Sequence, residues 1–267
     1  MRDVAMMVGE VVYNPRFQFL TRMKKIAALT LALASAATVA HAQSATRFGV
    51  RFGGTYSTIG GKNADQVQGF TGSNDYKLGY NAGISAQFPL SSDGFWTIAP
   101  ELIYNRKGFE RSYKLSDRNT LTTNGYAANV DKVSFENKRV LSYIDLPIPV
   151  RVNTAPGGSG LYFELGPQVG YMVASKQETT LTVKYSGNQS DMVTKSPENK
   201  AKEDLASFDI GGVAGLGYQT ESGISIGVRY NQGLKTLFDT KNVSAKNEPK
   251  AFNRAFMVQV GYLLPTR

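Results

Sequence analysis

The sequence predicts an all-β fold, an eight-stranded antiparallel up-and-down transmembrane β-barrel, and three observations support this prediction. Eight segments alternate apolar side chains with small or polar ones, a period of two that is typical of strands with one apolar face. Tight turns and longer polar connections follow one another in strict alternation, as they do when an antiparallel barrel sorts its connections onto two rims. No stretch after residue 42 has 18 continuous apolar residues, so membrane residence would require strands.

The eight predicted strands and their connections can be placed along the chain. The strands are expected at 46–56, 78–90, 96–107, 143–152, 161–173, 208–218, 224–231 and 256–262. The tight turns are expected at 91–94, 153–160 and 219–223. The longer connections are expected at 57–76, 111–139, 175–205 and 235–251. An even number of strands returns both ends of the barrel to one rim, on the periplasmic side.

Segment 161–173 shows the alternation most clearly. One face carries Leu161, Phe163, Leu165, Val169, Tyr171 and Val173. The opposite face carries Tyr162, Glu164, Gly166, Gln168 and Gly170. The first face suits lipid and the second suits a crowded polar interior, so parity along each strand predicts which side chains enter the barrel.

Aromatic residues gather near the ends of the predicted strands. Their amphipathic rings suit the headgroup level of a bilayer, so they are interpreted as the two girdles of a membrane barrel. The candidates are Tyr56, Tyr76, Tyr80, Phe88, Phe95, Trp96, Tyr104, Tyr143, Tyr218, Tyr230 and Tyr262.

Three local features modify this pattern. Pro147 and Pro149 remove two ladder donors from one predicted strand, so a bulge or a loosened pairing is expected there. The glycine-rich run 211–217 is read as a strand, since a strand follows it where a phosphate-binding loop would need a helix. Asn124-Gly125 is expected to form a tight turn that extends the third and fourth strands outward as a hairpin, with a protruding edge suited to strand addition.

The N-terminus indicates export. Lys24-Lys25 precede an apolar run from residue 26 to 40, and Ala40-His41-Ala42 fits a small-x-small cleavage site. Residues 23–42 are therefore expected to be a signal peptide that is cleaved after Ala42. Residues 1–22 are interpreted as a spurious upstream extension, and 43–267 as the outer-membrane β-barrel domain.

Composition after cleavage restricts the chemistry. The only histidine, His41, lies in the predicted signal peptide, and the chain has no cysteine. The predicted mature chain therefore lacks the usual soft metal ligands, the common thiol nucleophile and the side chain that titrates nearest neutrality. No catalytic, cofactor-binding or metal-binding residue is assigned and no cofactor is expected. Nucleic-acid binding is disfavoured, because the charge is mixed and the compartment is wrong.

Charges of both signs occupy the inward positions of the predicted strands. We expect them to pair as a lumen charge network, because an unpaired buried charge is costly and side chains just fill an eight-stranded barrel. The alternatives are a gated path for protons or small solutes, and a carboxylate pair of the glycosidase type. The residues are Arg51, Glu101, Asp145, Arg151, Glu164, Asp209 and Arg229.

The longest predicted connection, 111–139, mixes basic and acidic residues. It is read as a solvated loop, with contact to lipopolysaccharide phosphates as the functional alternative. The basic residues are Arg111, Lys114, Arg118, Lys132, Lys138 and Arg139, and the acidic residues nearby are Glu110, Asp117, Asp131 and Glu136.

Several motifs resemble those of the PorT-like outer-membrane β-barrel family. The more specific ones are Tyr143-x-Asp145-x-Pro147 and Gly166-Pro167-x-x-Gly170, and the similarity extends over about 43–264. The resemblance implies an eight-stranded barrel, and it implies a link to the secretion and maturation of surface proteases through the founding member of the family. The chain departs from common barrels at its C-terminus, which continues past Tyr262 to Arg267 instead of ending on an aromatic residue.

These observations favour a non-enzymatic integral outer-membrane protein of a Gram-negative cell, with a structural or surface-interaction role carried by long extracellular loops. The expected partners are outer-membrane lipid and lipopolysaccharide, and proteins bound through the loops. The alternative is an accessory component of an outer-membrane secretion or assembly apparatus. A barrel hydrolase or acyltransferase is disfavoured by the missing histidine, and a diffusion porin by the strand number, since wide channels need about 16 strands.

Overall fold

Long antiparallel strands make up most of the chain. The computed structural model describes residues 46–61, 66–67, 70–71, 73–187, 189–200, 202, 205–238 and 250–265. The predicted signal peptide, its cleavage site and the upstream residues 1–22 lie outside this described part. The main strands are β1 (Arg47–Gly60), β4 (Ser73–Pro89), β5 (Trp96–Ile98), β6 (Glu101–Leu115), β7 (Val130–Pro147), β8 (Val150–Ala155), β9 (Ser159–Tyr185), β11 (Phe208–Gln219), β12 (Ile224–Gly233) and β13 (Phe252–Leu263).

Smaller elements connect or flank these strands. They are β2 (Gln66–Val67), β3 (Phe70–Thr71), α2 (Arg118–Thr123), η2 (Pro156–Gly158) and β10 (Met192–Lys195). None of the described helices is long and apolar enough to cross a membrane.

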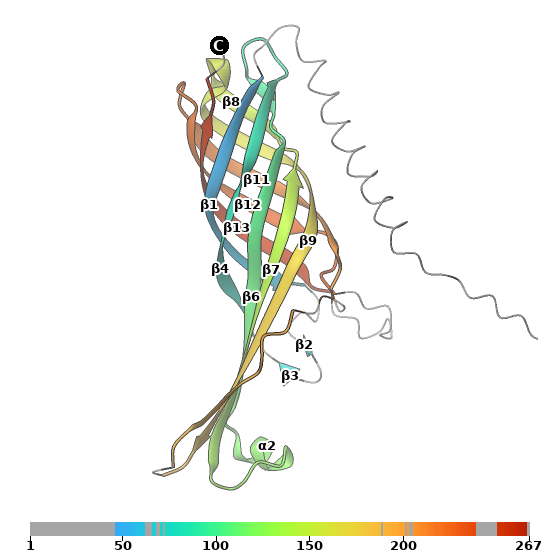
Figure 1. The fold of residues 1–267 in the computed structure, drawn as a ribbon, viewed down its shortest axis with the longest axis vertical. Coiled ribbons are helices and arrows are strands. Elements are labelled where there is room, and N and C mark those ends of the chain that lie inside the picture. Colours follow the sequence, from blue (N-terminus) through green and yellow to red (C-terminus); the bar gives the residue numbers. More distant parts are fainter. Residues whose placement is uncertain are drawn as a thin grey trace, which may run out of the picture. The chain divides into compact units, whose positions relative to one another are not determined.

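The strands close into a ring (Figure 1). Each strand is antiparallel to its neighbours, and β1 closes the ring because it pairs with β4 on one side and with β13 on the other. Val50, for example, lies opposite Ile84 of β4 and Tyr262 of β13. When β5 and β6 count as one crossing and β7 and β8 as another, the ring has eight strands. The predicted fold class is confirmed.

Two of the crossings are interrupted at proline. β7 ends at Pro147 and β8 begins at Val150, so the loosened pairing expected there is confirmed. A matching interruption at Ala99 and Pro100 separates β5 from β6 and was not predicted. The two breaks lie side by side, since the Ala99 amide donates to the Pro149 carbonyl at 2.9 Å. Proline has no backbone N–H to donate to a neighbouring strand, so the pairing of both crossings is interrupted at the same place.

One rim of the barrel carries the tight turns, and we call it the short-turn rim. The turns lie at 91–94, at η2 and at 220–223, as predicted. Gly94 and Gly223 adopt φ values of 74° and 93°, which favour glycine over other residues. The Leu264 amide donates to the Phe48 carbonyl at 2.7 Å, so the first and last strands meet at this rim. We call the opposite end the long-loop rim.

Three strands continue past the long-loop rim. β6, β7 and β9 run on beyond the barrel, and α2 lies near the far end of this extension (Figure 1). The expected loops at 111–139 and 175–205 are therefore strand over about half their length, which corrects the prediction. Beyond the barrel the outer face of the sheet no longer meets lipid, so the sequence there loses the lipid-facing half of its alternation.

The outward hairpin is present, but Asn124-Gly125 does not form its turn. Asn124 is the C-cap of α2, and its backbone N–H donates to the Thr120 carbonyl at 3.1 Å, while the Gly125 N–H donates to the Thr122 carbonyl at 2.9 Å. Gly125 follows with a φ of 79°. A helix forms here because Asp117 caps its first turn and Leu121 is buried beneath it.

The outer wall of the barrel is apolar, and its aromatic residues contact one another near the two rims. Near the long-loop rim the ring pairs are Tyr56–Tyr76, Tyr76–Phe256, Tyr80–Tyr104, Tyr171–Phe208 and Tyr230–Phe256. Phe95 and Trp96 form a pair at the short-turn rim. Tyr143 is wrongly placed by the girdle prediction, because it is fully buried inside the barrel. Tyr143 lies two residues before Asp145 on β7, so the two side chains point to the same face of the strand, which is the interior of the barrel.

Candidate functional site

The seven charged residues expected in the lumen are all buried. Five of them form one connected set of ion pairs, which we call the lumen network. Its members are Arg51, Glu101, Arg151, Glu164 and Arg229.

Glu101 and Glu164 each hold two arginines of the lumen network. Arg229 makes a two-pronged contact with Glu101, with Nη1–Oε2 at 2.8 Å and Nη2–Oε1 at 2.9 Å. Arg51 Nη1 lies 3.0 Å from the Oε1 atom of Glu101. Arg229 Nε donates to Glu164 Oε1 at 2.7 Å, and Arg151 Nη2 lies 2.8 Å from Glu164 Oε2. Because the five residues come from β1, β6, β8, β9 and β12, the network ties opposite walls together.

The lumen network has three arginines but only two glutamates, so it carries one excess positive charge. Tyr162 contacts two of the arginines and helps to stabilise this charge. Its ring centroid lies 4.0 Å from the Arg151 guanidinium carbon, and its hydroxyl accepts from Arg51 Nη2 at 3.2 Å. The hydroxyl lies against Gly217 and Gly227, where any Cβ would collide with it. Sequence parity placed Tyr162 inside the barrel but indicated no role for it.

Asp145 and Asp209 are not joined to the lumen network. Asp145 Oδ2 lies 2.8 Å from Lys107 Nζ and accepts from Asn105 Nδ2 at 3.0 Å. Asp209 Oδ2 accepts from Asn253 Nδ2 at 2.9 Å. Lys107 has the same inward parity as Glu101 and Asn105, so the pattern that selected the other charges could also have found it.

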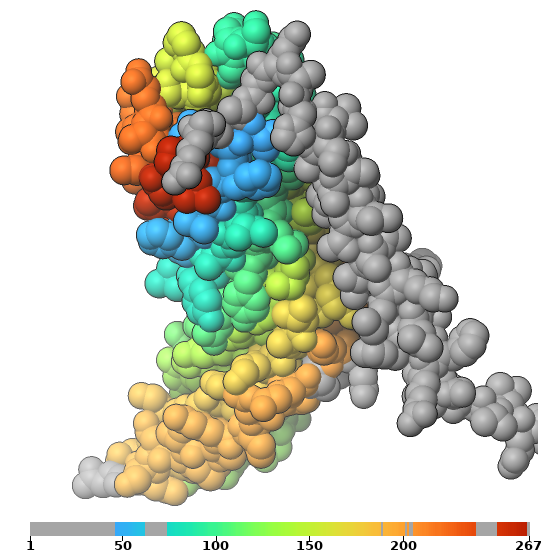
Figure 2. Space-filling model, turned by 45° about the horizontal axis from the view of Figure 1, so that its top comes forward, coloured from blue at the N-terminus to red at the C-terminus, as the bar shows by residue number. Residues whose placement is uncertain are grey.

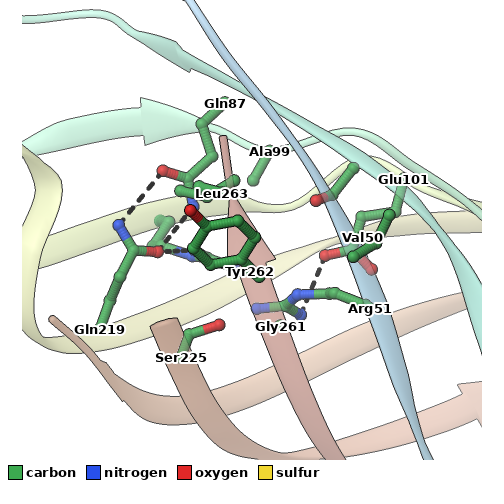
Figure 3. A pocket seen from close by; sticks show the side chains of 12 residues that line it. Val50, Arg51, Gln87, Ala99, Glu101, Gln219, Ser225, Gly261, Tyr262 and Leu263 are labelled. Atoms are coloured by element: carbon green, nitrogen blue, oxygen red, sulfur yellow. Dashed lines mark hydrogen bonds and ion pairs between the residues drawn. The ribbon is translucent and has the colours of Figure 1, made fainter. Parts of the chain in front are cut away.

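Side chains close the lumen at both ends. At the short-turn rim, Gln87 donates to Gln219 at 2.9 Å, and Gln219 donates to the Gly158 carbonyl at 2.6 Å. Figure 3 shows these glutamines beside Arg51 and Glu101 around a cavity of about 10 Å³, which is room for about one water molecule. At the long-loop rim an apolar cluster fills the barrel. Its members are Ile59, Phe109, Leu141, Tyr143, Met172, Leu205, Leu237 and Ala251.

The geometry of the lumen restricts what it can do. Glu101 and Glu164 share Arg229, and the cavity described beside Glu101 has room for about one water molecule, whereas a glycosidase-type pair would have to flank a sugar. Among the described residues, no group of three or more His, Cys, Asp or Glu side chains could hold a metal ion. The arrangement is that of a packed, ion-paired interior that holds the strands in place.

The extension beyond the long-loop rim has a core of its own. We call this part, residues 110–136 and 178–196, the projecting sheet. Figure 2 shows it extending from one end of the barrel. The core residues are Leu115, Leu121, Val130, Val133 and Val183, with Tyr113, Tyr126, Phe135, Leu181 and Tyr185 packed around them. An independent apolar core keeps the sheet folded without support from a bilayer.

Helix α2 is attached to the projecting sheet by polar contacts. Asp117 accepts hydrogen bonds from the Thr120 amide and hydroxyl, both at 2.8 Å. These bonds hold the pKa of Asp117 below its usual value. Arg118 Nη1 donates to the carbonyls of Ala128 at 2.6 Å and Val130 at 3.0 Å. The helix is therefore a fixed cap on the sheet.

β10 forms an edge of the projecting sheet. Its residues are all exposed, and within the described chain it pairs only with β9. The Ser196 amide donates to the Thr179 carbonyl at 2.9 Å. Since hydrogen-bonded pairs alternate along an antiparallel ladder, the N–H groups of Val193 and Lys195 face away from β9. The edge thus presents two free backbone donors.

The family is shown by comparison with known sequences. The model of the family described as "Outer membrane protein beta-barrel domain" matches residues 41–239, well over half of the chain. The chain belongs to this family. This outer-membrane β-barrel protein has no match among curated proteins.

The chain is also similar to several solved structures, including the following three. Neisserial surface protein A is 12% identical, with a TM-score of 0.34, over 82% of this chain and 99% of that one. Ail of Yersinia pestis, in complex with the heparin analogue sucrose octasulfate, is 11% identical, with a TM-score of 0.37, over 83% and 100%. OprG from Pseudomonas aeruginosa is 12% identical, with a TM-score of 0.32, over 84% and 98%. The strand pairing and the family match define the fold of this chain.

Proposed function

We propose that this outer-membrane β-barrel protein is a non-enzymatic surface protein whose projecting sheet binds an extended polypeptide at the free edge of β10. The observation that carries the proposal is the pairing of β10 on one side only. Every strand of the barrel ring has two partners, whereas the N–H groups of Val193 and Lys195 in β10 have none among the described residues. An exposed edge of this kind is a template for strand addition.

The chemistry of the edge indicates what would bind. Val193 is more than half exposed, and Lys195 beside it has no ion-pair partner among the described residues. Both side chains lie on the same face of β10, because they are two residues apart. An incoming strand would place an apolar residue near Val193 and an acidic residue near Lys195. Pro197 ends the edge after a few residues, which limits self-association.

The barrel serves as the anchor in this proposal. Its filled lumen and its apolar outer wall suit a rigid support embedded in a bilayer, with the long-loop rim outside the cell. Delivery by a signal peptide cleaved after Ala42 fits this placement. We propose that outer-membrane lipid and lipopolysaccharide surround the barrel, and that protein partners contact the projecting sheet.

Cross-linking in intact cells tests the proposal. A photoreactive amino acid at Val193 should yield a cross-linked protein partner, and the same group at Ser222 on the short-turn rim should not. A partner captured at Ser222 alone would contradict the surface role and favour an accessory role in secretion or assembly, as the resemblance to PorT-like proteins suggests.

Two matched variants separate backbone pairing from side-chain contact. Val193→Pro removes the outward N–H without touching the bonds to β9, whereas Val193→Thr keeps that donor and changes the side chain. With the photoreactive group moved to Lys195, capture should be lost in Val193→Pro and retained in Val193→Thr. Equal capture in both variants would contradict strand addition.

A further inference from the structure

We infer that two arginines on the lipid-facing wall, Arg106 and Arg254, bind phosphate groups of anionic lipid headgroups at the long-loop rim. The inference deepens the proposed function, on which it rests for the placement of the barrel in the membrane. It concerns a different surface from the edge of β10.

Arg254 lies at the long-loop end of β13 and points outward. It has the same parity as Phe256 and Val258, whose side chains are exposed on the outer wall. Its Nε is buried and has no hydrogen-bond partner. The guanidinium lies on Gly60, where a Cβ would come within 2.6 Å of its Nη1. The site therefore holds the guanidinium in place without neutralising it.

The neighbours of Arg254 across the sheet are neutral. It is paired with Thr58 of β1 and with Gln232 of β12. No described carboxylate forms an ion pair with it. Phe256, two residues closer to the middle of the wall, is in ring contact with Tyr76 and Tyr230. Arg254 thus lies directly beyond the aromatic belt, where headgroups begin.

Arg106 occupies an equivalent position on β6. Its guanidinium carbon lies 5.8 Å from the centroid of the Tyr80 ring, and Tyr80 contacts Tyr104 at 6.0 Å. Its partner across the sheet is Ser142, which is also neutral. The described residues provide no carboxylate for Arg106 either. Each of the two arginines therefore lies beside an aromatic residue of the belt and has no carboxylate partner among the described residues.

Two other cations of β4 and β7, by contrast, have a carboxylate within the protein. Lys77 lies 2.8 Å from Glu110, and Lys138 lies 3.9 Å from the same carboxylate. The contrast indicates that Arg106 and Arg254 take their counter-ions from outside the chain. A planar guanidinium suits phosphate, because it can donate two parallel hydrogen bonds. Around these residues the available anions are those of lipid headgroups.

Native mass spectrometry of the whole mature protein tests the inference. The protein, purified in neutral detergent, is titrated with phosphatidylglycerol and with phosphatidylcholine, and the bound lipids are counted. Wild type should prefer phosphatidylglycerol. Each single variant, Arg106→Gln or Arg254→Gln, should weaken this preference about fivefold, and the double variant about 25-fold. Arg254→Lys should retain more of the preference than Arg254→Gln.

Controls make the result decisive. Lys114→Gln removes an unpaired charge from the projecting sheet and should leave the preference unchanged. Excess inorganic phosphate should not displace the lipid, since a complete displacement would indicate a free-anion site. An unchanged preference in the double variant would overturn the inference. Gel mobility before and after heating reports whether each variant is folded. The cross-linking at β10 depends on neither arginine, so a failure of the lipid inference can be distinguished from a failure of the proposed function.

Discussion

Glu101→Gln is the perturbation that most strongly affects the lumen network. Among the described residues Glu101 is the one carboxylate in ion-pair contact with Arg51, and it also holds Arg229 through two charge-assisted hydrogen bonds. Glutamine has nearly the same shape, but its NH2 group is a hydrogen-bond donor. It would face the N–H donors of the arginines, so one of the present hydrogen bonds could not form. The change leaves three buried arginines with the single carboxylate of Glu164.

The expected cost follows from the burial of the pair. Both Glu101 and Arg229 have side chains no more than 1% exposed. Removing one partner of such a pair costs about 3 to 5 kcal/mol, because an uncompensated charge remains buried. With a urea slope near 3 kcal/mol per molar, the unfolding midpoint would fall by roughly 1 to 1.7 M.

Trp96 provides the assay. It is the only tryptophan in the chain and lies half-exposed on the lipid-facing wall, so its emission should shift to the red when the barrel unfolds from vesicles. Glu136→Gln, an identical change at an exposed position of the projecting sheet, is the matched control and should move the midpoint little. Equal midpoints for the two variants would refute the view that the network stabilises the barrel. The double variant Glu101→Gln/Arg229→Gln should recover part of the loss.

Three further predictions concern other parts of the molecule. Gly217→Ala should destabilise the barrel by about 1 to 3 kcal/mol, because its methyl group collides with the Tyr162 hydroxyl, and Tyr162→Phe in the same chain should recover part of this in urea unfolding. Leu121→Ala should loosen only the projecting sheet, by about 2 to 5 kcal/mol, seen as faster hydrogen exchange there with an unchanged Trp96 transition. Asp117 is stabilised as the carboxylate by Thr120, so α2 should be intact above pH 4 and lose protection as pH falls through the lowered pKa of Asp117, whereas Asp117→Asn should show no such pH dependence in hydrogen exchange.

Sequence parity predicted the two faces of each strand. Glu164 and Leu165 are neighbours, yet one is buried in the lumen and the other is exposed on the outer wall, as the alternation indicates. The prediction works because lipid and lumen differ sharply in polarity, so each strand is sorted residue by residue. Pro147 and Pro149 likewise predicted where the crossing is interrupted, because a residue without a backbone N–H disturbs the strand pairing at its own position.

The pairing inside the lumen could not be predicted in the same way. Glu101 and Arg229 are 128 residues apart, and parity gives the face of each but not its height in the barrel. Height depends on the stagger between neighbouring strands, which parity does not specify. Parity therefore places seven charges in the lumen without separating Asp145 and Asp209 from the other five.

The projecting sheet was missed for a different reason. Residues 130–139 carry charges on both faces, so they read as a solvated loop, although all of them except Asp131 pair with β6 or β9. The Asn124-Gly125 pair is compatible with a hairpin turn and with a helix C-cap, and the buried position of Leu121 decided between them. That burial depends on tertiary contacts with β7 and β9.

A disulfide across the seam between the first and last strands tests the closed barrel most directly. The chain has no cysteine, so Phe52→Cys/Val260→Cys would introduce a single pair, on directly opposed lipid-facing residues of β1 and β13. Opposed residues in an antiparallel ladder are within disulfide range, whereas the diagonal pair Phe52→Cys/Val258→Cys is about 7 to 8 Å apart. A closed ring in this register predicts efficient cross-linking of the first pair in membranes and little of the second. Absence of a cross-link in the first pair, or equal yields from both, would contradict the closed barrel.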